Sequence, residues 1–71
     1  MTVLIFKTNL NDPALLKIAT PLIQNMPGIR RWNVDMQDCD NVLRIEAVSL
    51  SARSVETVLQ EAGYYCEELL D

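Results

Sequence analysis

The order of apolar patterns along the chain constrains its fold more than any other feature. Residues 2–8, TVLIFKT, form a β-branched and aromatic run, which predicts a mostly buried strand. Asp12 and Pro13 then predict the start of a helix. The Asp carboxylate can accept a hydrogen bond from an unpaired amide of the first turn, and proline at the first helical position gives up a donor that had no partner. The chain therefore begins with a strand followed by a helix.

The predicted first helix carries apolar residues at intervals of three and four, and these form one stripe that faces a core. Its members are Leu16, Ala19, Leu22, Ile23 and Met26, with Leu15 at the margin. Pro27 and Gly28 are expected to end this helix. Residues 29–36, IRRWNVDM, alternate as a second strand does, and the polar segment 37–41, QDCDN, predicts a hairpin loop.

The second half of the chain continues with a strand, a helix and a final strand. The residues expected to face inward on the third strand are Leu43, Ile45 and Ala47. Ser51 is expected to cap a second helix, and Gly63 to end it in the left-handed conformation. Residues 64–69 predict a short closing strand.

This element order predicts a single α+β domain over residues 1–71, a ferredoxin-like βαββαβ sandwich. In such a sandwich two helices cover one face of a four-stranded antiparallel sheet. Right-handed crossovers place the first and last strands side by side, which gives the strand order 4-1-3-2. The turn at 9–12, the hairpin tip at 36–41 and the turn at 63–64 should then come to the same end of the sheet.

Charge and composition exclude several classes of function. A net charge of -4 and a pI near 4.5 argue against nucleic acid, because duplex binding depends on basic side chains. The apolar run at 3–6 is too short for a signal peptide or a membrane span, so we expect a cytoplasmic protein. Cys39 and Cys66 are then most simply free thiols. The sequence contains no histidine, and neither cysteine has an evident base beside it, so we expect no enzymatic activity.

Two segments resemble the heavy-metal-associated domain, the copper and zinc carrier module of metallochaperones and transport ATPases. MPGIRRWNVDM, at 26–36, is similar to the family pattern L-P-G-V-x-x-V-x-V-D-L. VETVLQEAGYYCEEL, at 55–69, is similar to the family's second helix and last strand, which end E-A-G-Y-x-A. The stripe of the first helix also agrees in spacing, so the resemblance covers nearly the whole chain and implies the same sandwich.

The functional motif of that family, G-M-x-C-x-x-C, has no counterpart in the turn after the first strand. Counting back from Pro27 places Asp12 and Leu15 at the two cysteine positions, and Leu10 where the methionine packs. Soft ions such as Cu(I) require thiolates, so this turn is expected to bind no soft metal and no cofactor. The same count leaves Lys7 at an apolar position. A one-residue insertion in the turn would instead direct Leu4 and Phe6 into the core.

Two alternatives remain open besides a module that has lost its metal. Cys39 and Asp12, with neighbouring carboxylates, could form a substitute site for copper or zinc, although one thiol among carboxylates is a poor Cu(I) site. The acidic hairpin lacks the glycine and the bidentate glutamate of a calcium loop, which favours a solvated turn. A small-ligand sensor, with an apolar ligand between the helices and the sheet, is supported only by analogy with other proteins of this fold.

Apolar surface is the feature that most favours a protein-binding role. If Leu4 and Phe6 point inward, the residues expected on the uncovered face of the sheet are Val3, Ile5, Val42 and Tyr65. The residues expected to form a second patch, near the turn, are Leu10, Leu15 and Tyr64. The leading interpretation is thus a small non-enzymatic module that binds a protein partner or forms a homo-oligomer through one or both patches.

Overall fold

A computed structural model describes residues 1–69 of the chain, and its element order is the one that the sequence predicts. The elements are β1 (Thr2–Thr8), α1 (Pro13–Gln24), β2 (Ile29–Asp35), β3 (Val42–Ala47), α2 (Ala52–Glu61) and β4 (Cys66–Glu68). Strand β4 is shorter than the expected 64–69. Its register with β1 covers residues 66–68, and the Leu69 amide donates to the Ile5 carbonyl at 2.8 Å just beyond the strand.

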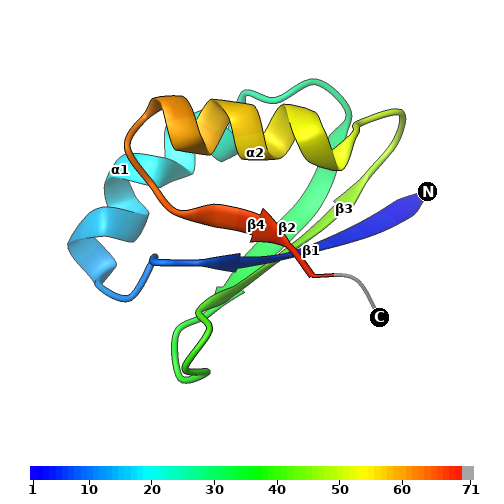
Figure 1. Cartoon of the computed structure of the whole chain (residues 1–71). Helices are drawn as coiled ribbons and strands as arrows, with labels where there is room; N and C mark the ends of the chain where they lie inside the picture. The colour runs from blue at the N-terminus through cyan, green and yellow to red at the C-terminus, as the bar shows by residue number, and fades with distance from the viewer. Residues whose placement is uncertain (70–71) are drawn as a thin grey trace.

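The strands form one antiparallel sheet with the order β2-β3-β1-β4, which confirms the predicted topology. Both helices lie on the same side of this sheet, above it in the view of Figure 1. The other face of the sheet carries no helix among residues 1–69 (Figure 1). The fold is therefore the expected two-layer α+β sandwich.

The alternation of buried residues resolves the orientation of β1. Leu4 and Phe6 are buried, whereas Lys7 is exposed. This pattern agrees with a one-residue insertion in the turn, and not with the count back from Pro27 that places Lys7 at an apolar position. Their register partners on β3, Ile45 and Leu43, are also fully buried. The core lies between these strands and the helix stripes. Its members are Leu4, Phe6, Leu10, Ala19, Ile23, Met26, Leu43, Ile45, Ala47, Val55, Leu59 and Cys66.

The predicted caps begin both helices. The Asp12 carboxylate accepts a hydrogen bond from the Ala14 amide at 2.7 Å, and Pro13 occupies the first helical position. The Ser51 hydroxyl accepts one from the Ser54 amide at 3.1 Å. At the far end of α2, Gly63 has a φ of +93°, the left-handed conformation expected of it.

Helix α1 ends earlier than Pro27 and Gly28 predict. Its last residue is Gln24, and the backbone amide of Asn25 closes the helix on carbonyl groups of the last turn. Gly28 has a different role: it has a φ of +88°, and a Cβ there would lie 2.1 Å from the Val48 carbonyl oxygen. Only glycine allows this approach, which lets β2 and β3 close their end of the sheet.

Strand β2 contains a β-bulge that the alternating pattern did not reveal. Ile29 pairs with Ala47 and Arg31 pairs with Glu46, so Arg30 is the extra residue. The register is regular from Arg31 to the end of the strand. The bulge thus separates an irregular start of β2 from a straight remainder.

Candidate functional site

The end of the sheet where a metal-carrying turn would lie is joined to the β2–β3 hairpin. The Thr8 amide donates to the Asp40 carbonyl at 3.1 Å, and the Thr8 hydroxyl donates to the Asn41 carbonyl at 2.6 Å. Thr8 and Asn41 are both buried. The predicted meeting of the turn and the hairpin at one end is therefore correct.

The turn before α1 is also joined to the segment before β4. The Asn9 side-chain oxygen accepts a hydrogen bond from the Tyr65 amide at 3.0 Å. The Tyr64 hydroxyl donates to the Leu15 carbonyl at 3.4 Å. Leu15 and Tyr64 are only partly buried and pack against the core. These two residues lie together at this end, as expected.

Leu10 does not belong to a surface patch, and that expectation is wrong. Its side chain has no exposed surface, and its amide donates to the Thr8 hydroxyl at 3.2 Å. The turn folds back after β1 and directs Leu10 into the core. With Asp12 capping α1, the turn uses its side chains for structure.

The hairpin tip collects the donor groups that the turn lacks. Asp38, Cys39 and Asp40 place one carboxylate or thiol atom each within 4.8 Å of one another. The Asp38 carboxylate also accepts the Asp40 amide at 2.8 Å, and the Lys7 ammonium lies 3.5 Å from the Asp40 carboxylate. Asp12 is not a member of this cluster, so the alternative that combined Cys39 with Asp12 is replaced by Cys39 with its two sequence neighbours.

The second thiol, Cys66, is enclosed in the core and differs from Cys39 in chemistry. Burial, together with the nearby negative charge of Glu56, raises the pKa of Cys66 to about 12. The group is therefore a neutral thiol at physiological pH, which is neither a nucleophile nor a metal ligand.

The uncovered face of the sheet carries the predicted apolar residues. Val3 and Tyr65 are each 46% exposed, and Ile5 and Val42 are partly buried. A hollow of about 250 Å³ on this face is lined by Ile5, Asn33, Asp35, Asp38, Val42 and Arg44. The Tyr65 hydroxyl donates to the Glu67 carboxylate, and this hydrogen bond raises the pKa of Tyr65. Apolar and charged groups therefore alternate across the face.

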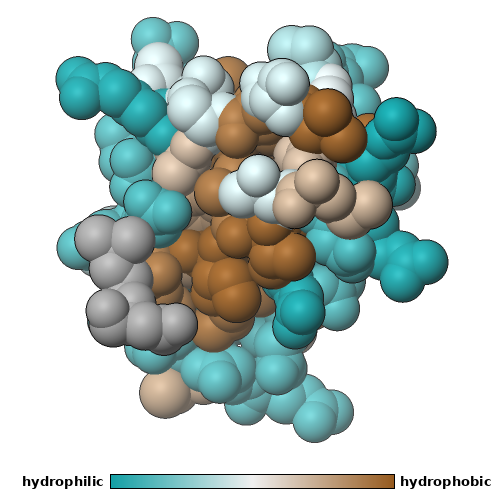
Figure 2. All heavy atoms as spheres, turned by 90° about the vertical axis from the view of Figure 1, so that its right-hand side faces the viewer, coloured by the Kyte–Doolittle hydropathy of each residue, from teal (hydrophilic) through white to brown (hydrophobic). Residues whose placement is uncertain are grey.

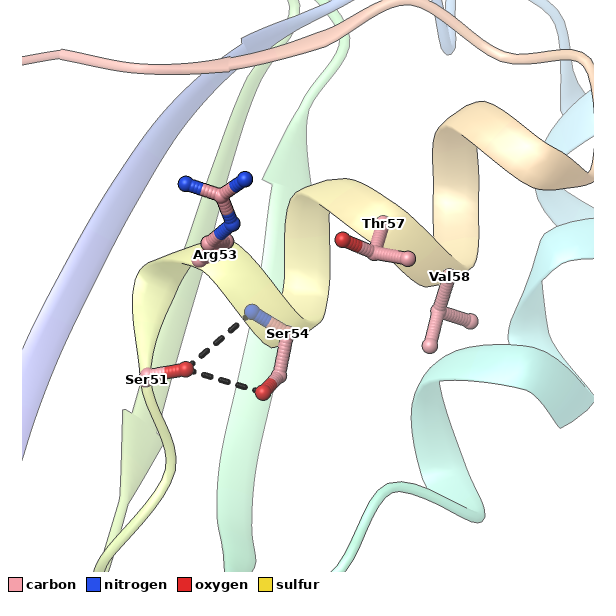
Figure 3. A pocket seen from close by; sticks show the side chains of 5 residues that line it. All are labelled: Ser51, Arg53, Ser54, Thr57 and Val58. Atoms are coloured by element: carbon pink, nitrogen blue, oxygen red, sulfur yellow. Dashed lines mark hydrogen bonds between the residues drawn. The ribbon is translucent and has the colours of Figure 1, made fainter.

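A second hollow, of about 390 Å³, lies at the start of α2 (Figure 3). Its lining residues are Ser51, Arg53, Ser54, Thr57 and Val58. Figure 3 shows the Ser51 hydroxyl directed at both the amide and the hydroxyl of Ser54, the latter at 2.8 Å. Two of the polar residues of this hollow, Ser51 and Ser54, thus belong to the helix cap.

The opposite end of the sandwich has an apolar region that the sequence interpretation missed. Figure 2 shows hydrophobic atoms gathered in the middle of this end, with hydrophilic atoms around them. Met1 and Val48 are exposed and lie here, because Thr2 pairs with Ala47 at the end of β1. The sequence signal for this region was the position of Met1 directly before β1 and of Val48 directly after β3.

Solved structures with the same architecture include a copper transporter domain. The yeast copper transporter domain Ccc2a matches with a TM-score of 0.80 and 19% identity over 100% of this chain and 99% of that chain. This chain therefore has the fold of that copper transporter domain. A chain from a study of crosstalk between Cu(I) and Zn(II) homeostasis matches with a TM-score of 0.83 and 11% identity, over 97% of this chain and 100% of that chain.

A further match comes from a complex of two proteins. It is a chain of the Atx1–Cu(I)–Ccc2a complex, with a TM-score of 0.73 and 18% identity, over 97% of this chain and 96% of that chain. No family model matches the sequence, and no curated protein matches it. Within residues 1–69, neither helix combines the length and the apolar character that crossing a bilayer requires.

Proposed function

We propose that this chain is a non-enzymatic, cytoplasmic interaction module with the heavy-metal-associated fold, which binds a protein partner and carries no soft metal in its first turn. The observation that carries the proposal is the use of that turn for structure. Asp12 caps α1 and Leu10 is buried. No residue from 9 to 16 is a cysteine, so the turn offers no thiolate to a soft ion.

The partner surface in this proposal is the uncovered face of the sheet, extended by the end of the molecule near α1. Val3, Ile5, Val42 and Tyr65 supply apolar area on the face, and Leu15 and Tyr64 supply it at the end. Exposed apolar patches with polar groups around them mark protein-binding surfaces. The neighbour from the Atx1–Cu(I)–Ccc2a complex supports a binding role, because that structure contains two associated proteins.

A partner titration tests the surface directly. Amide shifts are recorded while a candidate partner protein is added, and the largest changes are expected at Val3, Ile5, Val42 and Tyr65. A chain with Val3→Ser and Tyr65→Ser keeps the buried face of both segments intact. It is expected to give smaller amide shifts than the parent chain does. Shifts confined to the opposite end, near Met1 and Val48, would contradict the proposed surface.

A second candidate function is metal binding at the hairpin tip, and one observation favours it. Asp38, Cys39 and Asp40 bring two carboxylates and one thiol within 4.8 Å, and zinc accepts both kinds of ligand. Asp38 and Cys39 are exposed, so water or another molecule could supply the remaining ligands of a bound ion. Copper or zinc would then be cargo held at the hairpin and not at the turn.

Anaerobic titration with Cu(I) and with Zn(II) separates the two functions. The interaction module is expected to bind neither ion stoichiometrically, and Cys39→Ser should leave the titration unchanged. Stoichiometric binding that disappears in Cys39→Ser, and persists in the matched control Asp12→Asn, would overturn the first proposal in favour of a carrier.

A further inference from the structure

Strand β2 ends the sheet with an unused edge. It is seven residues long and pairs only with β3, and within residues 1–69 no other strand or loop pairs with its outer side. The opposite edge strand, β4, has only three residues. A long exposed edge presents unpaired amide and carbonyl groups that can accept another strand.

We propose that a second copy of this chain occupies this edge, through antiparallel pairing of the two β2 strands centred on Asn33. The helices of both copies would then lie on the same side of one continuous sheet. The contact would be made by the edge of β2, whereas the apolar residues proposed above for a partner on the sheet face lie on β1, on β3 and before β4, so this inference does not depend on that proposal.

Charge complementarity selects this register. Pairing centred on Asn33 places Arg31 of each copy opposite Asp35 of the other, on the uncovered face of the sheet. Both residues are exposed, and Lys7–Asp40 is the sole ion pair within residues 1–69, so Arg31 and Asp35 are free to pair. Opposite charges directly across two antiparallel strands stabilise the pairing.

Neighbouring registers lose these contacts. A centre on Trp32 would place Arg31 opposite Asn33, and a centre on Val34 would place it opposite Gln37. Within the regular segment from Arg31 to Asp35, neither register contains an ion pair between the strands. A register in which each residue moves to the next partner along the other strand would pair inner side chains with outer ones. The register centred on Asn33 is therefore the one that the sequence of β2 favours.

The remaining contacts agree with the same register. On the helix side it places Trp32 opposite Val34, two half-buried apolar residues that pack against the core and would lose further exposed surface. Asp35 accepts the amides of Gln37 and Asp38 through one carboxylate oxygen, Oδ1, which leaves Oδ2 for Arg31. The bulge keeps Arg30 out of the regular segment, so the pairing extends over Arg31 to Asp35.

Disulfide trapping tests the register. In Asn33→Cys, built on Cys39→Ser, the two new thiols face one another with Cα atoms about 5 Å apart, within disulfide reach. Mild oxidation is expected to yield a covalent dimer. The control is Arg44→Cys on the same background, because Arg44 pairs with Asn33 one strand further in and its two copies would lie about 14 Å apart. Equal cross-linking of both variants would overturn the register.

Sedimentation of the uncross-linked chain tests the association itself. A small edge interface predicts a reversible dimer, detectable at protein concentrations up to about 1 mM. Arg31→Gln and Asp35→Asn should each weaken it about three- to tenfold, and the double variant no further, because both single changes remove the same ion pairs. A chain that stays monomeric over this range would refute the proposal. So would a double variant whose loss of affinity equals the sum of the two single losses in free energy.

Discussion

The turn before α1 and the β2–β3 hairpin lie at the same end of the sheet but use their polar groups in opposite ways. In the turn, Asp12 caps a helix and Asn9 accepts a hydrogen bond from the Tyr65 amide. At the hairpin tip, the Cys39 thiol is exposed beside two carboxylates. The turn is thus a structural connection, whereas the tip keeps groups that solvent and ions can reach.

This difference shows what the turn contributes to the fold. A metal-binding turn needs two adjacent thiolates, but the helix that follows needs only a cap and an apolar anchor. Asp12 and Leu10 meet those two needs. The turn is therefore held by a helix cap and a buried side chain, and the donor groups at the hairpin are a separate feature of the sequence.

The largest expected contrast is in thiol reactivity, because Cys39 belongs to the tip and Cys66 lies opposite Thr8 beside the turn. A thiol-specific reagent at pH 8 should modify Cys39 at once. Cys66 should react only as fast as the chain unfolds, because its buried thiol is neutral. Timed modification of the Cys39→Ser and Cys66→Ala variants measures both rates, and similar rates for the two thiols would contradict this difference.

The raised pKa of Cys66 also predicts a loss of stability in alkali. Folding raises this pKa from its ordinary value of 9.0 to about 12, so the folded chain keeps a proton that the unfolded chain releases. The contribution to stability is complete below pH 9 and is lost as the pH rises toward 12. Denaturation midpoints measured across this range should fall less steeply in Cys66→Ala. Parallel curves for the two proteins would show that Cys66 makes no such contribution.

Burial of Leu10 predicts the next largest effect. Leu10→Ala removes a fully buried side chain, so the free energy of unfolding should fall by about 2–5 kcal/mol in urea denaturation. The control is Ile18→Ala, an apolar truncation on the exposed side of α1, which should cost less than about 0.5 kcal/mol. Equal effects of the two truncations would mean that Leu10 is at the surface, as the sequence alone had indicated.

Most of the fold could be predicted because it follows from local patterns. The strand order, both helix caps and the left-handed Gly63 are stated by short sequence signals, and each agrees with the structure. The sequence left open which side chains of β1 face the core, and the burial of Leu4 and Phe6 resolves it. Alternation alone gives two possible faces for a strand, and only the tertiary packing selects one.

The missed features depend on contacts that short sequence patterns do not state. Leu10 is buried because the Thr8 hydroxyl folds the turn inward, which no pattern in the turn states. Gly28 reads as a helix terminator, yet its role is set by the Val48 carbonyl. The ligand cluster at the tip excludes Asp12, although both lie at one end of the sheet. Topology gives the end of the sheet where a residue lies, but not its distance from another residue.

The cap of α1 sharpens the comparison with a smaller effect. Asp12→Ala leaves a first-turn amide unpaired, so the chain should lose about 1 kcal/mol of stability. Asp12→Asn keeps the accepting oxygen and should behave as the parent chain does in the same denaturation experiment. If Asn and Ala cost the same, the negative charge of Asp12 matters more than its hydrogen bond, and the turn would then resemble the tip.

The smallest expected effect concerns the Lys7–Asp40 ion pair, which joins β1 to the tip. Both side chains are more than 40% exposed, so Lys7→Gln should lower the free energy of unfolding by only about 0.2–0.5 kcal/mol, and less at high salt. The same variant removes the positive charge nearest to the cluster of Asp38, Cys39 and Asp40. We expect it still to bind no zinc stoichiometrically in a calorimetric titration. Acquired zinc binding, lost again on adding Cys39→Ser, would show that a single ammonium group separates an inert tip from a metal site.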